Sequence, residues 1–318
     1  MGEIIMQNRD IILFRGLFES RVMTAEHIAV LFFNGSREAA KKRLQKLKAA
    51  GFIGERKRKA YEPAVLSLTV KAVSVLRIRG ILAEYPKLAS SALDKRTRVS
   101  DLTIRHELEV MDCKAAFHSA IKGLPKFGIS EFCTWPLLHQ FEAFRKGYGG
   151  EEVMIKPDGF IRISEEEDGG HASEYSLFLE LDRSSQTQDT LVSRASAYLD
   201  FYRSGGFAMR NGGTRDKFRD FPFRVLFVFK NAERRNNMAE RLLRNTPPIL
   251  TQALLSTFDE VKASPFGAIW VRPLEYREAT KGTEYEPENR REQAGYRRQT
   301  ARELFVEESV RKQPLLGP

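Results

Sequence analysis

The chain has 318 residues, of which 42% are hydrophobic and 30% charged, so it is long enough for two globular domains and its composition excludes intrinsic disorder. No apolar run reaches the ~18 residues that a membrane span needs, and the first ten residues lack the basic-then-apolar order of a secretory signal. The two cysteines, Cys113 and Cys133, have no CxxC spacing and are too few for a disulfide scaffold or a zinc site. We therefore expect a cytoplasmic protein without a membrane partner.

The positive charge is concentrated in the first third of the chain. Residues 1–100 contain 20 lysines and arginines against 9 acidic residues, a balance of +11, whereas residues 101–318 contain 32 against 33. A concentration of cations on one module is typical of proteins that bind a polyanion. A membrane surface would also attract cations, but no amphipathic helix with bulky anchors accompanies them here. The distribution favours nucleic acid, and double-stranded DNA is the expected partner.

Three helices are predicted before residue 51, over 8–18, 25–33 and 37–50. Thr24 and Ser36 are suitable N-caps for the second and third helices, because their hydroxyl oxygens can accept from a free backbone N–H. Asn34-Gly35 predicts a tight turn between these two helices, and Gly51 is expected to end the third.

A short hairpin is predicted after the third helix, with strands near residues 52–53 and 65–68 around a basic tip at 55–59. Thr69 can cap a fourth helix over 70–79. Residues 86–100 are interpreted as a linker. The order helix, helix, turn, basic helix, hairpin predicts a winged helix-turn-helix domain over residues 1–85.

The third helix and the wing supply the predicted DNA contacts, because a helix can enter the major groove and cations can reach phosphates. The alternative is a solvated charged helix beside a charged turn, which leaves the confinement of the charge unexplained. Lysines outnumber arginines on this helix, which indicates contacts to phosphate more than to base edges. The predicted DNA-binding residues are Arg37, Lys41, Lys42, Lys46, Arg56, Lys57, Arg58 and Lys59.

The second part of the chain alternates strands and helices, which predicts an α/β domain with one central sheet. Strands are expected over 129–141, 155–163, 176–181 and 223–229, and helices over 102–121, 187–202 and 234–243. Residues 205–219 are expected to form a polar loop, and the charged stretch after residue 279 a flexible tail.

Several acidic residues of this part could form a metal site. Asp158 enters one predicted strand beside Lys156, and Glu180 and Asp182 share one face of another because side chains alternate along a strand. Carboxylates from neighbouring strands can hold Mg²⁺, which prefers oxygen ligands and activates a water for attack on a phosphodiester. Glu109, or alternatively Glu107, could contribute a ligand from the helix that also carries His106, although a histidine on a helix is more often a surface or packing residue.

The basic winged helix, His106, Pro157-Asp158 and the run Phe178–Arg183 followed by Tyr198 together resemble the replication-relaxation family of plasmid and mobile-element proteins. The resemblance extends over about residues 8–275 and rests on short motifs. It implies a second domain like the PD-(D/E)xK nucleases, hence the fold class α+β or α/β: an N-terminal winged helix-turn-helix followed by a PD-(D/E)xK-like α/β domain with a central mixed sheet. It also implies a role in DNA replication, relaxation or transfer, with replication or conjugation proteins as partners.

The sequence departs from the nuclease pattern at one position. Where that pattern has a lysine two residues after the second acid, this chain has Asp182. Lys156, Arg183 or Arg194 could replace the lysine, but an arginine is a poor general base because it does not deprotonate. The centre is therefore expected either to bind Mg²⁺ weakly or to be inert.

Three functions remain open at this point. The preferred one is a mobile-element DNA-binding protein whose nuclease-like domain, residues 101–278, precedes a tail over 279–318. The first alternative is an active Mg²⁺-dependent endonuclease or nickase that uses Asp158, Glu180, Asp182 and Lys156, and the second is a transcription regulator that binds a palindromic operator, as a homodimer would. The sequence has no GxGxxG, GxxxxGK, GxSxG or HExxH motif, which argues against a small-molecule enzyme.

Overall fold

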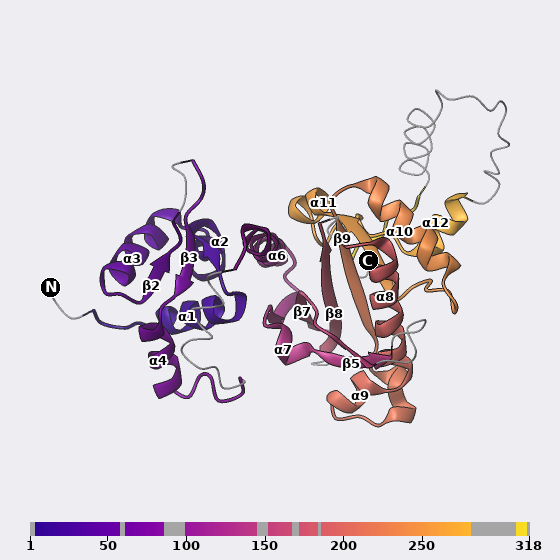
Figure 1. Ribbon diagram of the computed structural model, residues 1–318, viewed down its shortest axis with the longest axis horizontal. Coiled ribbons are helices and arrows are strands. Elements are labelled where there is room, and N and C mark those ends of the chain that lie inside the picture. Colours follow the sequence, from indigo (N-terminus) through magenta and orange to yellow (C-terminus); the bar gives the residue numbers. More distant parts are fainter. Residues whose placement is uncertain are drawn as a thin grey trace. The chain divides into compact units, whose positions relative to one another are not determined.

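A computed structural model of the chain describes residues 4–57, 61–85, 99–144, 152–166, 172–183, 186–280 and 310–316. The chain divides into two compact units (Figure 1). The first unit comprises residues 1–122 and 133–138, and the second comprises residues 123–132 and 139–318. No helix in the described part of the chain is both long and apolar enough to span a bilayer.

The first unit is mainly helical and contains one small sheet. Its three strands are antiparallel and lie in the order β1-β3-β2. The elements in chain order are α1 (Asn8–Ser20), β1 (Met23–Thr24), α2 (Ala25–Phe32), α3 (Arg37–Ala49), β2 (Ile53–Glu55), β3 (Val65–Leu68), α4 (Val70–Ile78) and α6 (Asp101–Ala120).

Local capping explains where these helices begin. The side chains of Thr24, Ser36, Thr69 and Ser100 each accept a hydrogen bond from the backbone N–H three residues later, which satisfies one of the free donors at the start of a helix. The connection between α2 and α3 uses the left-handed backbone at Asn34 and Gly35, with φ of 50° and 84°. Gly51, with φ of 76°, ends α3, so the predicted helix boundaries are confirmed within one or two residues.

One apolar core holds the first unit together. Phe14 of α1 stacks on Phe52 with ring centroids 5.6 Å apart, and Leu47 of α3 is fully buried. Trp135, from the segment 133–138, stacks on Phe18 at 4.8 Å with an interplanar angle of 7°. Because α6 and this segment belong to the first unit, that unit extends beyond the module predicted over residues 1–85.

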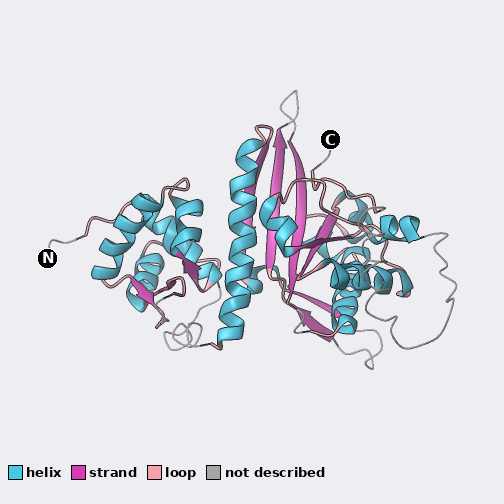
Figure 2. Cartoon of the chain, turned by 90° about the horizontal axis from the view of Figure 1, so that it is seen from above, coloured by secondary structure: helices cyan, strands magenta, loops and turns pink. Residues whose placement is uncertain are grey.

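The second unit is built on a five-stranded mixed sheet (Figure 2). The strand order is β10-β9-β8-β7-β4, with β8, β9 and β10 parallel to one another and β7 antiparallel to β8. A separate antiparallel hairpin pairs β5 with β6. The strands are β4 (Phe127–Cys133), β5 (Phe141–Phe144), β6 (Glu152–Ile155), β7 (Gly159–Glu166), β8 (Ala172–Asp182), β9 (Phe223–Phe229) and β10 (Ala253–Thr257).

Helices and an aromatic cluster cover this sheet. Phe178 of β8 is fully buried and lies within 5.1 Å, between ring centroids, of Tyr198 on α8 and Phe223 on β9. The fold class, α+β with a mixed central sheet, is thereby confirmed. The remaining helices of the second unit are α8 (Gln188–Arg203), α9 (Gly206–Arg210), η2 (Arg215–Asp220), α10 (Ala232–Arg244), α11 (Phe258–Ala263) and α12 (Pro273–Thr280). Residues 136–138 of α7 (Pro136–His139) belong to the first unit.

Three of the predicted elements of the second part were wrong in extent. The strand expected over 129–141 is β4 followed by α7 and β5, and α7 begins at Pro136, a residue suited to the first turn of a helix. The strand expected over 155–163 is divided between β6 and β7 at Pro157, which cannot donate to a strand ladder. The loop expected over 205–219 contains α9 and η2.

The tail and the linker are only partly described. Residues 86–98 of the expected linker and 281–309 of the expected tail lie outside the described residues. Residues 310–316 pack on the second unit, so for them the prediction of a flexible tail is wrong. Gln313 and Trp270 exchange two backbone hydrogen bonds, and Val310 and Leu316 are buried. Val310 belongs to the apolar core that also contains Leu255 of β10.

Candidate nucleic-acid interface and acidic centre

Helix α3 is fixed in the first unit by an apolar stripe and by one buried ion pair. Ala40, Leu44 and Leu47 recur at helical spacing and face the core. Next to this stripe, Arg43 forms an ion pair with Asp10 of α1. Asp10 is fully buried, and the Nε of Arg43 donates to Asp10 Oδ1 at 2.9 Å. Arg43 therefore positions α3 and is not available to a ligand.

The remaining surface of α3 carries three unpaired cations. Lys41, Lys42 and Lys46 are exposed and lie outside the buried stripe. None of them forms a hydrogen bond or ion pair with another described residue. An ammonium group held on a rigid helix without an intramolecular partner is available to a phosphate.

The other predicted cations of the first unit are partly engaged. Arg37 pairs with Glu26 of α2 at 2.8 Å, and both are more than half exposed, so solvent weakens the pair. Arg56 donates to Asp101 at 2.8 Å and to the carbonyl of Val99 at 3.2 Å. Lys57 is exposed, whereas Arg58 and Lys59 lie outside the described residues.

A groove of about 370 Å³ borders α3 on the side of α2 and β3. Arg37, Lys41 and Lys48 line it together with Glu26 and Glu38. Its mixed charge distinguishes it from the α3 surface that carries Lys42 and Lys46.

The expected ligands on the long helix belong to the first unit. Glu107 on α6 forms an ion pair with Arg21 at 3.4 Å. His106 and Glu109 lie on the same helix and are half-buried.

In the second unit, β8 ends in an acidic centre. Glu180 and Asp182 are buried at its carboxyl end and point to the same face, as the alternation along the strand predicted. Asp158, in the connection before β7, accepts from the backbone N–H of Leu181 at 2.8 Å. The structure thus brings Asp158 beside the end of β8.

Glu180 is bound by two side chains of α8. Arg194 Nη2 donates to both of its carboxylate oxygens, at 2.5 and 2.7 Å, and the Tyr198 hydroxyl donates to Oε1 at 2.5 Å. Burial raises the pKa of Glu180 to about 7, and Asp158 acts in the same direction, whereas Arg194 and Tyr198 act to lower it. Burial also holds the pKa of Tyr198 well above its usual value, so it remains a neutral donor.

Asp182 has a different partner. Arg234 of α10 binds it through Nε and Nη2, one nitrogen to each carboxylate oxygen, which is the usual fork arrangement between arginine and a carboxylate. No local pattern in the sequence connects Arg234 with Asp182, because the two residues lie 52 positions apart. Lys156 is exposed and contributes its backbone carbonyl, which accepts from Arg194 Nη2 at 2.8 Å.

These contacts do not fit Mg²⁺ as long as Arg194 is in place. The two oxygens of Glu180 and the carbonyl of Lys156 already surround a guanidinium nitrogen. Among the described residues, Asp158, Glu180 and Asp182 do not place ligand oxygens of all three within 4.8 Å of one another. Of the three residues considered as a replacement for the nuclease lysine, Arg194 is the one that contacts Glu180, and it does not act as a base.

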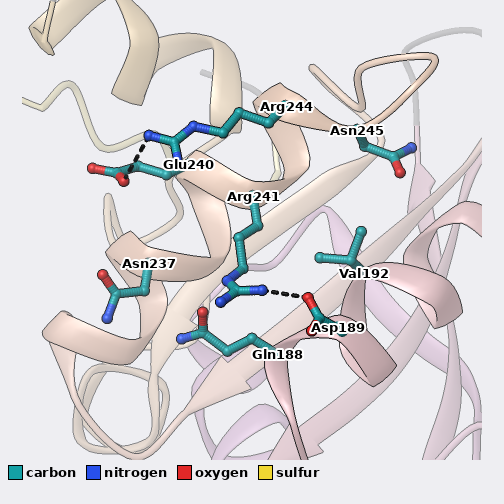
Figure 3. Close-up of a pocket in the computed structure, with 8 residues that line it drawn as sticks. All are labelled: Gln188, Asp189, Val192, Asn237, Glu240, Arg241, Arg244 and Asn245. Carbon is teal, nitrogen blue, oxygen red and sulfur yellow. Dashed lines mark hydrogen bonds and ion pairs between the residues drawn. The ribbon is translucent and has the colours of Figure 1, made fainter.

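A groove of the second unit lies elsewhere, between α8 and α10 (Figure 3). It has a volume of about 660 Å³, and seven of its eight lining residues are polar. Two arginines point into it, but Arg241 pairs with Asp189 and Arg244 pairs with Glu240. Since these charges balance, the groove gives no argument for an anionic ligand.

The chain is thus a two-unit α+β protein with a cationic helix in one unit and an arginine-paired acidic centre in the other. The sequence model of the replication-relaxation family matches residues 14–216. The chain belongs to this family. Comparison with curated proteins and with solved structures gave no match.

Proposed function

We propose that this protein binds double-stranded DNA through α3 and acts in the replication, relaxation or transfer of plasmid or other mobile-element DNA. In this proposal the first unit is a winged helix-turn-helix module. The second unit is a PD-(D/E)xK-like scaffold that holds DNA or a replication or conjugation protein without cutting DNA. The observation that carries the proposal is the set of three lysines on α3 that pair with none of the described residues.

Physical chemistry connects this surface to duplex DNA. A lysine that reaches a phosphate releases condensed counterions, and each such contact contributes about −0.9 to the slope of log affinity against log salt. Lys41, Lys42 and Lys46 are available for such contacts because no described residue neutralises them. The Asp10–Arg43 pair holds α3 rigidly, so little ordering is needed when the helix binds.

The acidic centre supports a scaffold more than a nuclease. Arg194 and Arg234 neutralise Glu180 and Asp182, and neither arginine can serve as a general base. The exposed Lys156 side chain makes no hydrogen bond or ion pair within the described part of the chain. These contacts favour a structural role for the centre.

The test is a salt titration of duplex binding by the full chain. The variant combines Lys41→Gln, Lys42→Gln and Lys46→Gln, since glutamine keeps the helix propensity and removes the charge. Loss of three phosphate contacts makes the plot of log affinity against log salt less steep by about 2.7. When the salt concentration rises from 50 to 200 mM, the fold-loss of affinity should therefore be about 40 times smaller for the variant than for the parent protein.

A charge-matched control separates this effect from net charge. It combines glutamine substitutions at Lys126, Lys217 and Lys230, which are exposed cations of the second unit. The control should keep the parent slope. If the α3 variant also keeps the parent slope and affinity, α3 is not the DNA-binding element.

Two further measurements address the rival functions. Incubation of the protein with supercoiled plasmid and Mg²⁺ should leave the plasmid intact, and nicking that Asp158→Ala abolishes would establish the nuclease instead. Footprinting that protects a single palindromic operator would indicate a transcription regulator bound as a homodimer.

A further inference from the structure

We propose that Arg194 Nη2 occupies a cation site built by Glu180 and the Lys156 carbonyl, so that the side chain of Arg194 itself keeps divalent metal out of the acidic centre. This inference concerns the second unit alone and is independent of DNA binding by α3.

Arg194 contacts Glu180 and the Lys156 carbonyl through a single nitrogen atom. A single nitrogen, Nη2, lies 2.5 and 2.7 Å from the two oxygens of Glu180 and 2.8 Å from the carbonyl oxygen of Lys156. Arginine usually binds a carboxylate with two nitrogens, one to each oxygen, as Arg234 does at Asp182. Here three oxygens converge on one atom, and oxygen is the ligand type that a hard cation prefers.

A second nitrogen of the same guanidinium is not satisfied. Arg194 Nε is buried and has no hydrogen-bond partner among the described residues. A buried donor without a partner is unfavourable, so hydrogen bonding by the whole guanidinium does not account for its position. The attraction of one nitrogen to the oxygen cluster does account for it.

Removal of Arg194 would leave a site with the charge and the access that a metal needs. Asp158 lies at the same end of β8, where its Oδ2 accepts from the backbone N–H of Leu181 at 2.8 Å, so its carboxylate would add a second negative charge beside Glu180. A cavity of about 130 Å³, lined by residues of β5, β6 and α8, reaches Arg194. That volume exceeds the ~30 Å³ that a water molecule occupies, so a partly hydrated ion can enter.

The experiment measures Mn²⁺ binding at pH 8 by the loss of the aqueous Mn²⁺ EPR signal. The parent protein should bind no Mn²⁺ at this centre. Arg194→Ala should bind about one equivalent, and its melting temperature should rise by about 3 °C or more at a tenfold excess of Mn²⁺ over the dissociation constant. The double variant Arg194→Ala, Glu180→Gln should lose both effects.

Arg234→Ala is the matched control, because it also removes a guanidinium from a buried carboxylate but from a fork-shaped pair. It should gain no Mn²⁺ site. Circular dichroism identifies variants that fail to fold, and Arg194→Ser is the substitute if Arg194→Ala does. A folded Arg194 variant that binds no Mn²⁺ would overturn the inference. Binding of Mn²⁺ by the parent protein that is abolished by Glu180→Gln would overturn it as well.

Discussion

The ion pair between Asp10 and Arg43 is expected to control the stability of the first unit. The perturbations are Asp10→Asn, which removes the charge at nearly constant volume, Arg43→Met, which keeps the apolar stem, and the combination of both. Asp10 is fully buried, and the Arg43 side chain is 12% exposed. Because Asp10 also accepts from the backbone N–H of Gln7 at 2.7 Å, it ties the start of α1 to α3.

The magnitude follows from this burial. Removal of one partner of a buried ion pair costs about 3–5 kcal/mol, because the other charge is left without compensation. For Asp10→Asn the loss in free energy of unfolding should lie near the lower end of this range, at roughly 2–4 kcal/mol. The reasons are that Arg43 is slightly exposed and that asparagine keeps an acceptor oxygen. The double variant leaves no uncompensated charge, so its loss should be smaller than the sum of the two single losses by about 2 kcal/mol.

The two tryptophans make the two units separately observable. Trp135 packs in the core of the first unit and Trp270 in the second. In a Trp270→Phe background, fluorescence during urea unfolding therefore reports the first unit, and the midpoint and slope give its free energy of unfolding.

Strictly additive losses would refute the reasoning, because they would mean that Asp10 and Arg43 contribute independently. A loss below 1 kcal/mol for Asp10→Asn would also refute it, since the buried charge of Arg43 would then be tolerated without its partner. DNA binding by Asp10→Asn in the absence of urea should keep the parent salt slope, because the lysines of α3 are intact.

Two further outcomes concern the second unit, read from Trp270 fluorescence in a Trp135→Phe background. Because the pKa of Glu180 is raised to about 7, its carboxyl binds a proton more tightly in the folded than in the unfolded protein. Relative to Glu180→Gln, the free energy of unfolding should thus fall by roughly 2–3 kcal/mol as the pH rises from about 4.5 to 7, and it should stay level above pH 7. A rise over this range would contradict the raised pKa of Glu180. Deletion of residues 310–318 exposes the surface that Val310 and Leu316 cover and removes the 2.7 Å contact from Lys312 to Glu260, so it should cost the second unit roughly 2–4 kcal/mol. An unchanged urea midpoint would show that this segment contributes nothing, and DNA binding serves as the control that should not change.

Features that depend on neighbouring residues were predictable from the sequence. The caps at Thr24, Ser36 and Thr69, the turn at Asn34-Gly35 and the end of α3 at Gly51 all involve groups within a few residues of one another. The strand β9 was predicted with its observed bounds, because its alternating aromatic residues indicate a buried strand. The shared face of Glu180 and Asp182 followed from the same alternation.

Features that depend on distant residues were decided by the tertiary structure. Residues 253–257 were not predicted as a strand, although β10 completes the parallel edge of the sheet, because five residues carry little periodicity of their own. The end of the chain returns to Trp270 through contacts that no local pattern encodes.

The chemistry of the acidic centre shows the same division. The sequence alone established which acids end β8 and that a lysine is missing after them. It could not establish that Arg194 would reach Glu180, or Arg234 reach Asp182, since those contacts exist only once α8 and α10 pack against the sheet. Charge neutralisation is a property of distances between side chains, and those distances are set by packing, not by order along the chain.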